Sequence, residues 1–86
     1  MTKEIVNYRI AAVTAAYNKL PSVPTLMNAG WDINDALKFS LESNKIAEKI
    51  QNAIFAVIFE NFDKASLMVN DAFEKATEML NVLIRY

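Results

Sequence analysis

The residues that interrupt regular secondary structure are confined to one short segment of this chain. Pro21, Pro24 and Gly30 are the only prolines and the only glycine among its 86 residues. Apolar side chains make up 53% of the chain, above the usual ~45–50%. This combination excludes disorder and predicts long regular elements on both sides of the segment. We therefore expect one all-α domain over residues 1–86, a small bundle of three main helices.

Residues 3–20 are expected to form the first helix. Thr2 suits its N-cap position, and Pro21 requires that it end at or before Leu20. Five apolar residues recur at alternating spacings of four and three, the pattern of a helix that lies along another: Val6, Ile10, Val13, Tyr17 and Leu20.

The segment with the prolines is expected to be ordered, with a short helical turn at 25–29 that Gly30 ends. Connections between helices normally run over the surface. This one carries Val23, Leu26, Met27 and Trp31, so it either folds back over the bundle or faces a partner. We expect at least half of the Trp31 side chain to be buried, because its apolar rings gain by docking.

The second helix is predicted over residues 33–61, with Asp32 as its N-cap. Its weakest part is near 43–44, where Ser43 and Asn44 compete for backbone hydrogen bonds, and a break there is left open. The third helix is predicted over 64–85, with its apolar residues in one sector. The helical register also runs unbroken through 62–66. One continuous helix in place of two is therefore an alternative, and it would require dimerisation.

The second helix is predicted to be apolar on two sides. One stripe consists of Phe39, Ile46, Ile50, Ala53, Ile54 and Val57. The other consists of Phe55, Phe59 and Phe62, in continuation of Leu37 and Leu41. A helix that is apolar on two sides is normally buried between neighbours, and two shorter helices can flank it but cover both sides less easily, so full burial of both stripes within the monomer is the alternative. We expect the first stripe to be buried within the monomer and the second to lie at an interface.

The sequence excludes most catalytic chemistry. It has no His and no Cys, which removes the commonest general base, thiol chemistry and nearly all zinc and haem sites. The acidic stretch 32–42 does not fit a calcium loop, because Leu37 stands where a glycine is needed. A single glycine also excludes a glycine-rich phosphate loop. We expect no enzyme activity, no metal and no cofactor.

The charge distribution and the N-terminal residues argue against nucleic-acid binding and secretion. Nine basic and ten acidic residues are scattered along the chain, without the basic stripe that nucleic-acid binding needs. The first residues lack the apolar core of a signal peptide, and no apolar run approaches the ~18 residues of a membrane span. We expect a soluble, cytoplasmic protein.

These observations favour a small non-enzymatic protein that acts by protein–protein contact, as a homodimer or as a binder of a larger partner. Phage-encoded inhibitors, immunity proteins and adaptors are of this size and class. A bundle that binds an apolar small molecule or lipid, with Trp31, Phe55 and Phe59 lining the site, and a structural subunit of a larger assembly are the alternatives. The candidate interface residues are Phe55, Phe59, Phe62, Leu37, Leu41, Leu26, Met27, Trp31 and Met68.

Overall fold

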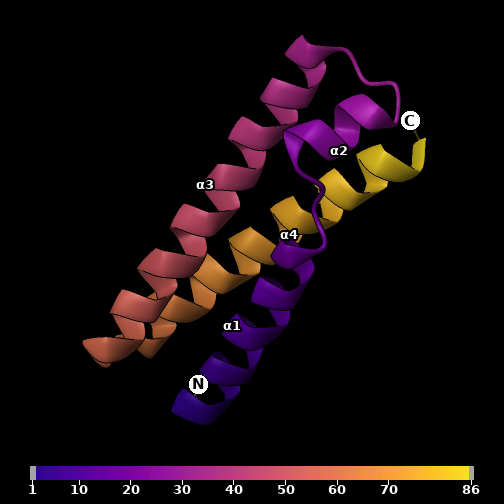
Figure 1. Cartoon of the computed structure of the whole chain (residues 1–86). Helices are drawn as coiled ribbons and strands as arrows, with labels where there is room; N and C mark the ends of the chain where they lie inside the picture. Colours follow the sequence, from indigo (N-terminus) through magenta and orange to yellow (C-terminus); the bar gives the residue numbers. More distant parts are fainter. Residues whose placement is uncertain (1, 86) are drawn as a thin grey trace.

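Four helices account for nearly all of the residues that the structure describes (Figure 1). The structure is a computed structural model that describes residues 2–85. Its helices are α1 (Lys3–Asn18), α2 (Val23–Asn28), α3 (Ile33–Ile58) and α4 (Phe62–Arg85), and no strand occurs within that range. The prediction of a small all-α bundle with three long helices is confirmed.

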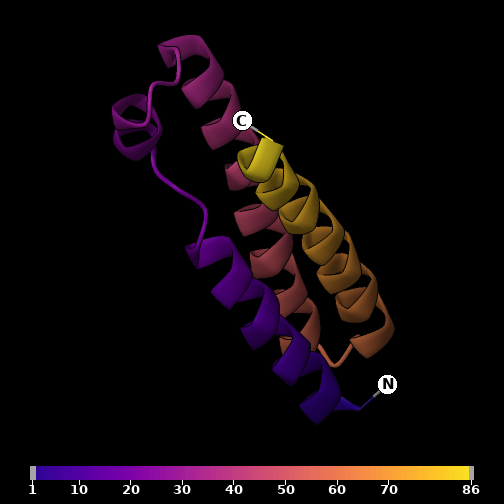
Figure 2. The same ribbon diagram turned by 90° about the vertical axis from the view of Figure 1, so that its right-hand side faces the viewer.

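The long helices lie side by side, with α1 and α4 running in one direction and α3 in the other (Figure 2). The short helix α2 packs against the N-terminal half of α3. Every other helix contacts α3. The bundle is elongated, 44 Å along its longest axis.

Helix α1 ends two residues earlier than predicted. Thr2 caps it as expected, since its side chain accepts a hydrogen bond from the backbone N–H of Ile5. At the other end, Lys19 and Leu20 donate to the carbonyls of Ala16 and Tyr17, three residues back. The last turn therefore tightens and leaves the α-helical pattern before Pro21 is reached.

Helix α2 is longer than the predicted turn and begins at Val23. Ser22 caps it by accepting from the backbone N–H of Thr25, and Pro24 occupies the first turn, where a missing N–H leaves no bond unmade. Gly30 follows the helix with a φ of 98°, a left-handed conformation that glycine adopts without steric cost. The chain then turns sharply enough to bring Trp31 back to α2. The backbone N–H of Trp31 donates a hydrogen bond to the backbone carbonyl of Leu26.

Helix α3 is continuous, so the break considered near 43–44 does not occur. The Ser43 hydroxyl lies in the core and donates to the Phe39 carbonyl at 3.0 Å. This hydrogen bond gives the buried Ser43 hydroxyl a partner within the same helix. The serine therefore does not interrupt the helix here.

Helices α3 and α4 are separate, so the single continuous helix is not adopted. Glu60 has a φ of 59°, which turns the chain at the end of α3. The N–H groups of Glu60 and Asn61 donate to the carbonyls of Val57 and Ala56, the two bonds of a Schellman motif. The Asn61 side chain then accepts from the backbone N–H of Lys64, and α4 begins at Phe62, two residues before the predicted start.

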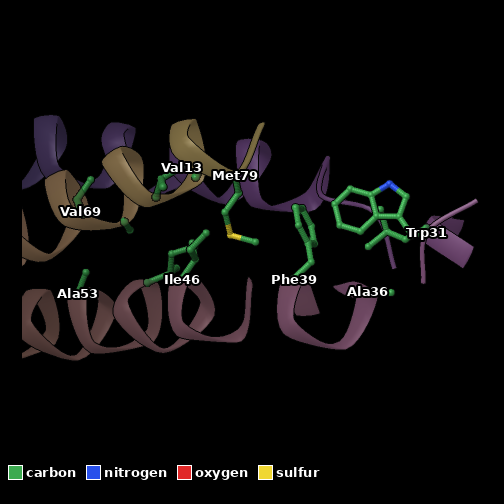
Figure 3. Close-up of a cluster of buried hydrophobic side chains, with 12 residues drawn as sticks. Val13, Trp31, Ala36, Phe39, Ile46, Ala53, Val69 and Met79 are labelled. Carbon is green, nitrogen blue, oxygen red and sulfur yellow. The ribbon is translucent and has the colours of Figure 1, made fainter. Parts of the chain in front are cut away.

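The main core lies between α1, α3 and α4, and Trp31 closes one end of it (Figure 3). Trp31 is 9% exposed, which confirms its predicted burial. Its ring meets Phe39 edge-on, with centroids 5.5 Å apart. Much of the rest of the core is formed by small side chains, among them Ala36, Ala53, Ala65, Ala72 and Ala76.

We expect Trp31→Ala to lower the free energy of unfolding by about 2–4 kcal/mol, as large truncations in a core do. Met27→Ala is the matched control, since Met27 is 44% exposed on the neighbouring helix, and it should cost about 1 kcal/mol or less. Denaturant unfolding followed by circular dichroism measures both. Equal losses in the two variants, or wild-type tryptophan emission like that of indole in water, would contradict this account.

Candidate functional site

The structure separates the two apolar stripes of α3. Phe39, Ile46, Ile50 and Ala53 from the first stripe are buried. They pack against residues of α1 and α4 that include Val13, Val69 and Met79 (Figure 3). The other two members of this stripe lie at the edge of the core. Val57 is half-buried, and Ile54 is 43% exposed. The prediction that this stripe lies within the monomer is confirmed for its central residues.

The second stripe stays at the surface. Leu37, Leu41, Phe55 and Phe59 are 46%, 63%, 51% and 79% exposed. Three polar residues on the same side of the helix, none of them predicted as an interface residue from the sequence, are exposed as well: Asn44, Glu48 and Asn52. We call these seven residues the outer face of α3. Because α1 and α4 pack on other sides of α3, nothing in the described chain covers this face.

One end of the outer face joins α4. Phe55 and Phe59 lie beside a shallow hollow of about 390 Å³ that Met68 of α4 also lines. Met68 itself is half-buried. The turn after α3 fixes Phe59, which is the C-cap residue of the helix and donates its backbone N–H to the Phe55 carbonyl at 3.1 Å. The structure thus brings together three of the predicted interface residues: Phe55, Phe59 and Met68.

The remaining candidates lie elsewhere. Phe62 is half-buried and packs on the small cluster of Val6, Ala56 and Ala65. Leu26 is 3% exposed, so it belongs with Trp31 to the core and offers no surface to a partner. Met27 is 44% exposed on α2, at the opposite end of the bundle from Phe59.

Trp31, Phe55 and Phe59 do not line a common site. Phe39, which contacts Trp31, precedes Phe55 by sixteen residues of continuous helix, or about 24 Å at 1.5 Å per residue. The ligand site considered from the sequence is therefore not formed by these three residues.

A different hollow, of about 430 Å³, lies between α3 and α4 at the Trp31 end. Its apolar lining comes from Trp31, Phe39, Met79 and Val82. Charged residues surround this lining: Asp35, Lys38, Glu42, Lys75 and Glu78. This hollow was not predicted from the sequence. The signal in the sequence was the spacing of Val82, three residues after Met79 and so on the same side of α4; the structure shows Val82 to be 46% exposed.

Ion pairs line the seam between α3 and α4. Glu42 accepts from the ammonium groups of Lys75 and Lys45, and Lys49 lies 3.8 Å from Asp71. The hydrogen bond from Lys75, followed by that from Lys45, holds the pKa of the Glu42 carboxyl below its ordinary value of 4.5. The same bond raises the pKa of Lys75 above 10.5. These pairs are accessible to water, so they add little to stability.

Neither a metal site nor a membrane span is found in the described residues. Within 2–85, no group of acidic side chains is arranged to hold a metal ion. None of the helices there is both long and apolar enough to cross a bilayer.

Comparison with known proteins gives no match: no family model, curated protein or solved structure is similar to this chain. The case for a function therefore depends on the geometry of the chain itself. The feature that bears on function is the exposure of Phe55 and Phe59, one turn apart on the outer face of α3.

We expect the Glu42 carboxyl to titrate with a midpoint below 4.5, measured by carbon NMR of the side-chain carboxyl. Because its pKa is lower in the folded than in the unfolded state, its contribution to stability is present above 4.5 and is lost as the pH falls through the folded-state pKa. Lys75→Met should move the midpoint upward, whereas Lys38→Met, on the rim of the same hollow, should leave it nearly unchanged. A wild-type midpoint at or above 4.5 would contradict the assigned ion pair.

Proposed function

We propose that this chain is a small non-enzymatic protein that acts by protein–protein contact, and that the outer face of α3 is its contact surface. The observation that carries the proposal is the exposure of two phenylalanine rings one helical turn apart, Phe55 at 51% and Phe59 at 79%. Aromatic side chains are enriched at interfaces and contribute much of their energy. A phenylalanine has no polar group with which to face water, so its exposure has a cost that a partner would remove.

The surroundings of the two rings support this proposal. Ile58, between them in sequence, is 64% exposed. With about 150–250 Å² for each large side chain, these three residues expose roughly 350 Å² of apolar surface, the size of patch that marks an interaction site on a small monomer. Asn52, Asn61 and Lys64 border the adjoining hollow. An apolar centre with a polar rim is the usual anatomy of a contact surface.

The partner of this surface is a second copy of the chain or a larger protein. A small inhibitor, an immunity protein and an adaptor, of phage or bacterial origin, would all act through a surface of this kind. The absence of His and Cys from the sequence accords with a role in binding and not in catalysis.

The test is Phe59→Glu. We expect this variant to lose self-association, measured by light scattering, or its partner, measured by pull-down from the cells that produce the protein, and to keep its helical circular dichroism. Tyr8→Glu is the matched control, because Tyr8 is an aromatic residue 75% exposed on α1, away from the proposed surface. The control should behave as the wild type does.

Two results would contradict the proposed function. If Phe59 belonged to the core, the variant would lose its helical signal, because an unpaired buried carboxylate costs several kcal/mol against a small total stability. If Tyr8→Glu impaired association as strongly as Phe59→Glu, the effect would be one of general surface charge. The outer face of α3 would then have no special part in binding.

A second candidate function is the binding of an apolar small molecule in the hollow lined by Trp31, Phe39, Met79 and Val82. Its volume of about 430 Å³ falls in the range of ~300–1,000 Å³ that ligand sites occupy. We expect native mass spectrometry of the purified protein to show a retained small-molecule mass if this function holds. Val82→Glu should abolish retention, and a wild-type spectrum with only the mass of the bare chain or its multimers would exclude it.

A further inference from the structure

The outer face of α3 reads the same from either end. Its seven residues are Leu37, Leu41, Asn44, Glu48, Asn52, Phe55 and Phe59. Starting from Leu37 the steps between them are four, three, four, four, three and four residues, and starting from Phe59 they are identical. The residue types follow the same symmetry, with two apolar side chains at each end, an asparagine on either side of the centre, and Glu48 at the centre.

This pattern occupies one continuous surface. At 100° per residue the seven side chains leave α3 within an arc of about 80°, and all seven are exposed. Leu37 and Phe59 each lie eleven residues from Glu48, so the face extends for about 33 Å along the helix. A two-fold axis perpendicular to α3 at Glu48 would map the face onto itself with its ends exchanged.

We propose that the outer face of α3 binds the same face of a second copy of the chain in antiparallel orientation, with the two-fold axis at Glu48. This inference rests on the proposed function and names its partner. In this arrangement Leu37 meets Phe59 of the second copy and Leu41 meets Phe55. Asn44 meets Asn52, and Glu48 meets Glu48. Two-fold pairing requires only one self-complementary surface, because each residue contact occurs twice.

The area of the face fits a dimer. With about 150–250 Å² for each large side chain, the exposed fractions of Leu37, Leu41, Phe55 and Phe59 give roughly 450 Å² of apolar surface. Ile33 and Ile58, 50% and 64% exposed at the two ends of α3, raise this to roughly 650 Å². The three polar side chains at the centre bring it toward the ~800 Å² that each partner of a standard interface buries.

Side-chain size favours the antiparallel over the parallel orientation. When the helices run in opposite directions, each apolar layer pairs one leucine with one phenylalanine, so the two ends of the interface are equally thick. Parallel helices would pair leucine with leucine at one end and phenylalanine with phenylalanine at the other, and the interface would be wedge-shaped. Antiparallel α3 helices also place opposite ends of their helix dipoles together.

The polar centre sets the register. An asparagine side chain both donates and accepts hydrogen bonds, so Asn44 and Asn52 of opposite copies can satisfy each other. Polar residues in a helix–helix seam fix its register and orientation at some cost in stability. Glu48 adds to that cost, because two like charges approach each other at the axis. The dimer is therefore weaker than its apolar area alone would make it.

The absence of Cys from the chain allows a clean cross-linking test of the register. Glu48→Cys should form a disulfide-linked dimer under mild oxidation, and so should a mixture of Leu41→Cys with Phe55→Cys. Leu41→Cys and Phe55→Cys alone should cross-link at least about tenfold more slowly, because disulfides require Cα atoms within ~7 Å. Circular dichroism verifies that each variant is folded, and non-reducing gels measure the yield.

A second measurement tests the contact of the two Glu48 side chains at the two-fold axis and requires no oxidation. Glu48→Gln removes the like-charge contact and should tighten the dimer by roughly three- to tenfold in Kd, measured by sedimentation. The matched control is Glu74→Gln, which removes an exposed carboxylate on α4 and should leave Kd unchanged. An increase in affinity cannot arise from misfolding. Equal effects of the two substitutions, or a weaker dimer with Glu48→Gln, would overturn the register.

The failures of this inference and of the proposed function are distinguishable. Self-cross-linking of Leu41→Cys would show a parallel pair, and a dimer in which Glu48→Cys does not cross-link would show another interface. A wild-type chain that stays monomeric at ~1 mM would exclude a second copy as the partner, since specific complexes form well below that concentration. Each result overturns the antiparallel dimer, whereas the proposed function is decided separately by the comparison of Phe59→Glu with Tyr8→Glu.

Discussion

The fold depends on the packing of α3, the one helix in the described residues that contacts each of the others. Its long run without Gly or Pro presents apolar side chains in two directions. Helices α1 and α4 cover one direction only, because they also contact each other. A fourth long helix, or a second chain, would be needed to cover the other direction. The uncovered face of α3 is thus a direct consequence of how few elements this chain contains.

The three sides of α3 differ in chemistry as well as in burial. The core side is apolar and holds small side chains that let the helices approach closely. The side along α4 carries the ion pairs of Glu42 and Lys49. The outer face is apolar at its ends and polar at its centre. Because water screens exposed ion pairs, burial on the core side holds the bundle together.

Much of the fold could be predicted from local signals. Thr2 and Asp32 are N-caps where the sequence places them, and the spacing of Ile46, Ile50 and Ala53 identifies the buried side of α3. Two features had no such signal. A serine at position 43 is compatible with a break in the helix or with a hydrogen bond from its hydroxyl to the carbonyl four residues back. Which of the two occurs depends on the burial of the side chain, which the sequence does not give. The turn after α3 uses Glu60 in a left-handed conformation that a glycine would ordinarily adopt, so the sequence predicted an interruption between residues 61 and 64 but not the type of turn or its position two residues earlier.

The candidate site was also predictable in part. The exposure of Phe55 and Phe59 follows from counting how much helix surface two neighbours can cover. Leu26 and Met27 could not be told apart, since a helix as short as α2 is too brief for apolar periodicity to show. Asn44, Glu48 and Asn52 were not predicted as interface residues, because apolar periodicity gives no weight to polar side chains. Their symmetric arrangement about Glu48 becomes visible only when the whole face is known to be exposed.

The abundance of alanine in the core has a consequence for how the protein responds to temperature. The largest fully buried side chains are Ile46, Val6, Val13 and Val69, and many of their neighbours are alanines. Unfolding such a bundle exposes less apolar surface for each residue than unfolding a core of leucine and phenylalanine. The heat-capacity change of unfolding scales with that surface, so it is small here. The curve of stability against temperature is correspondingly weakly curved, so cooling weakens this bundle less than it weakens one whose core holds larger side chains.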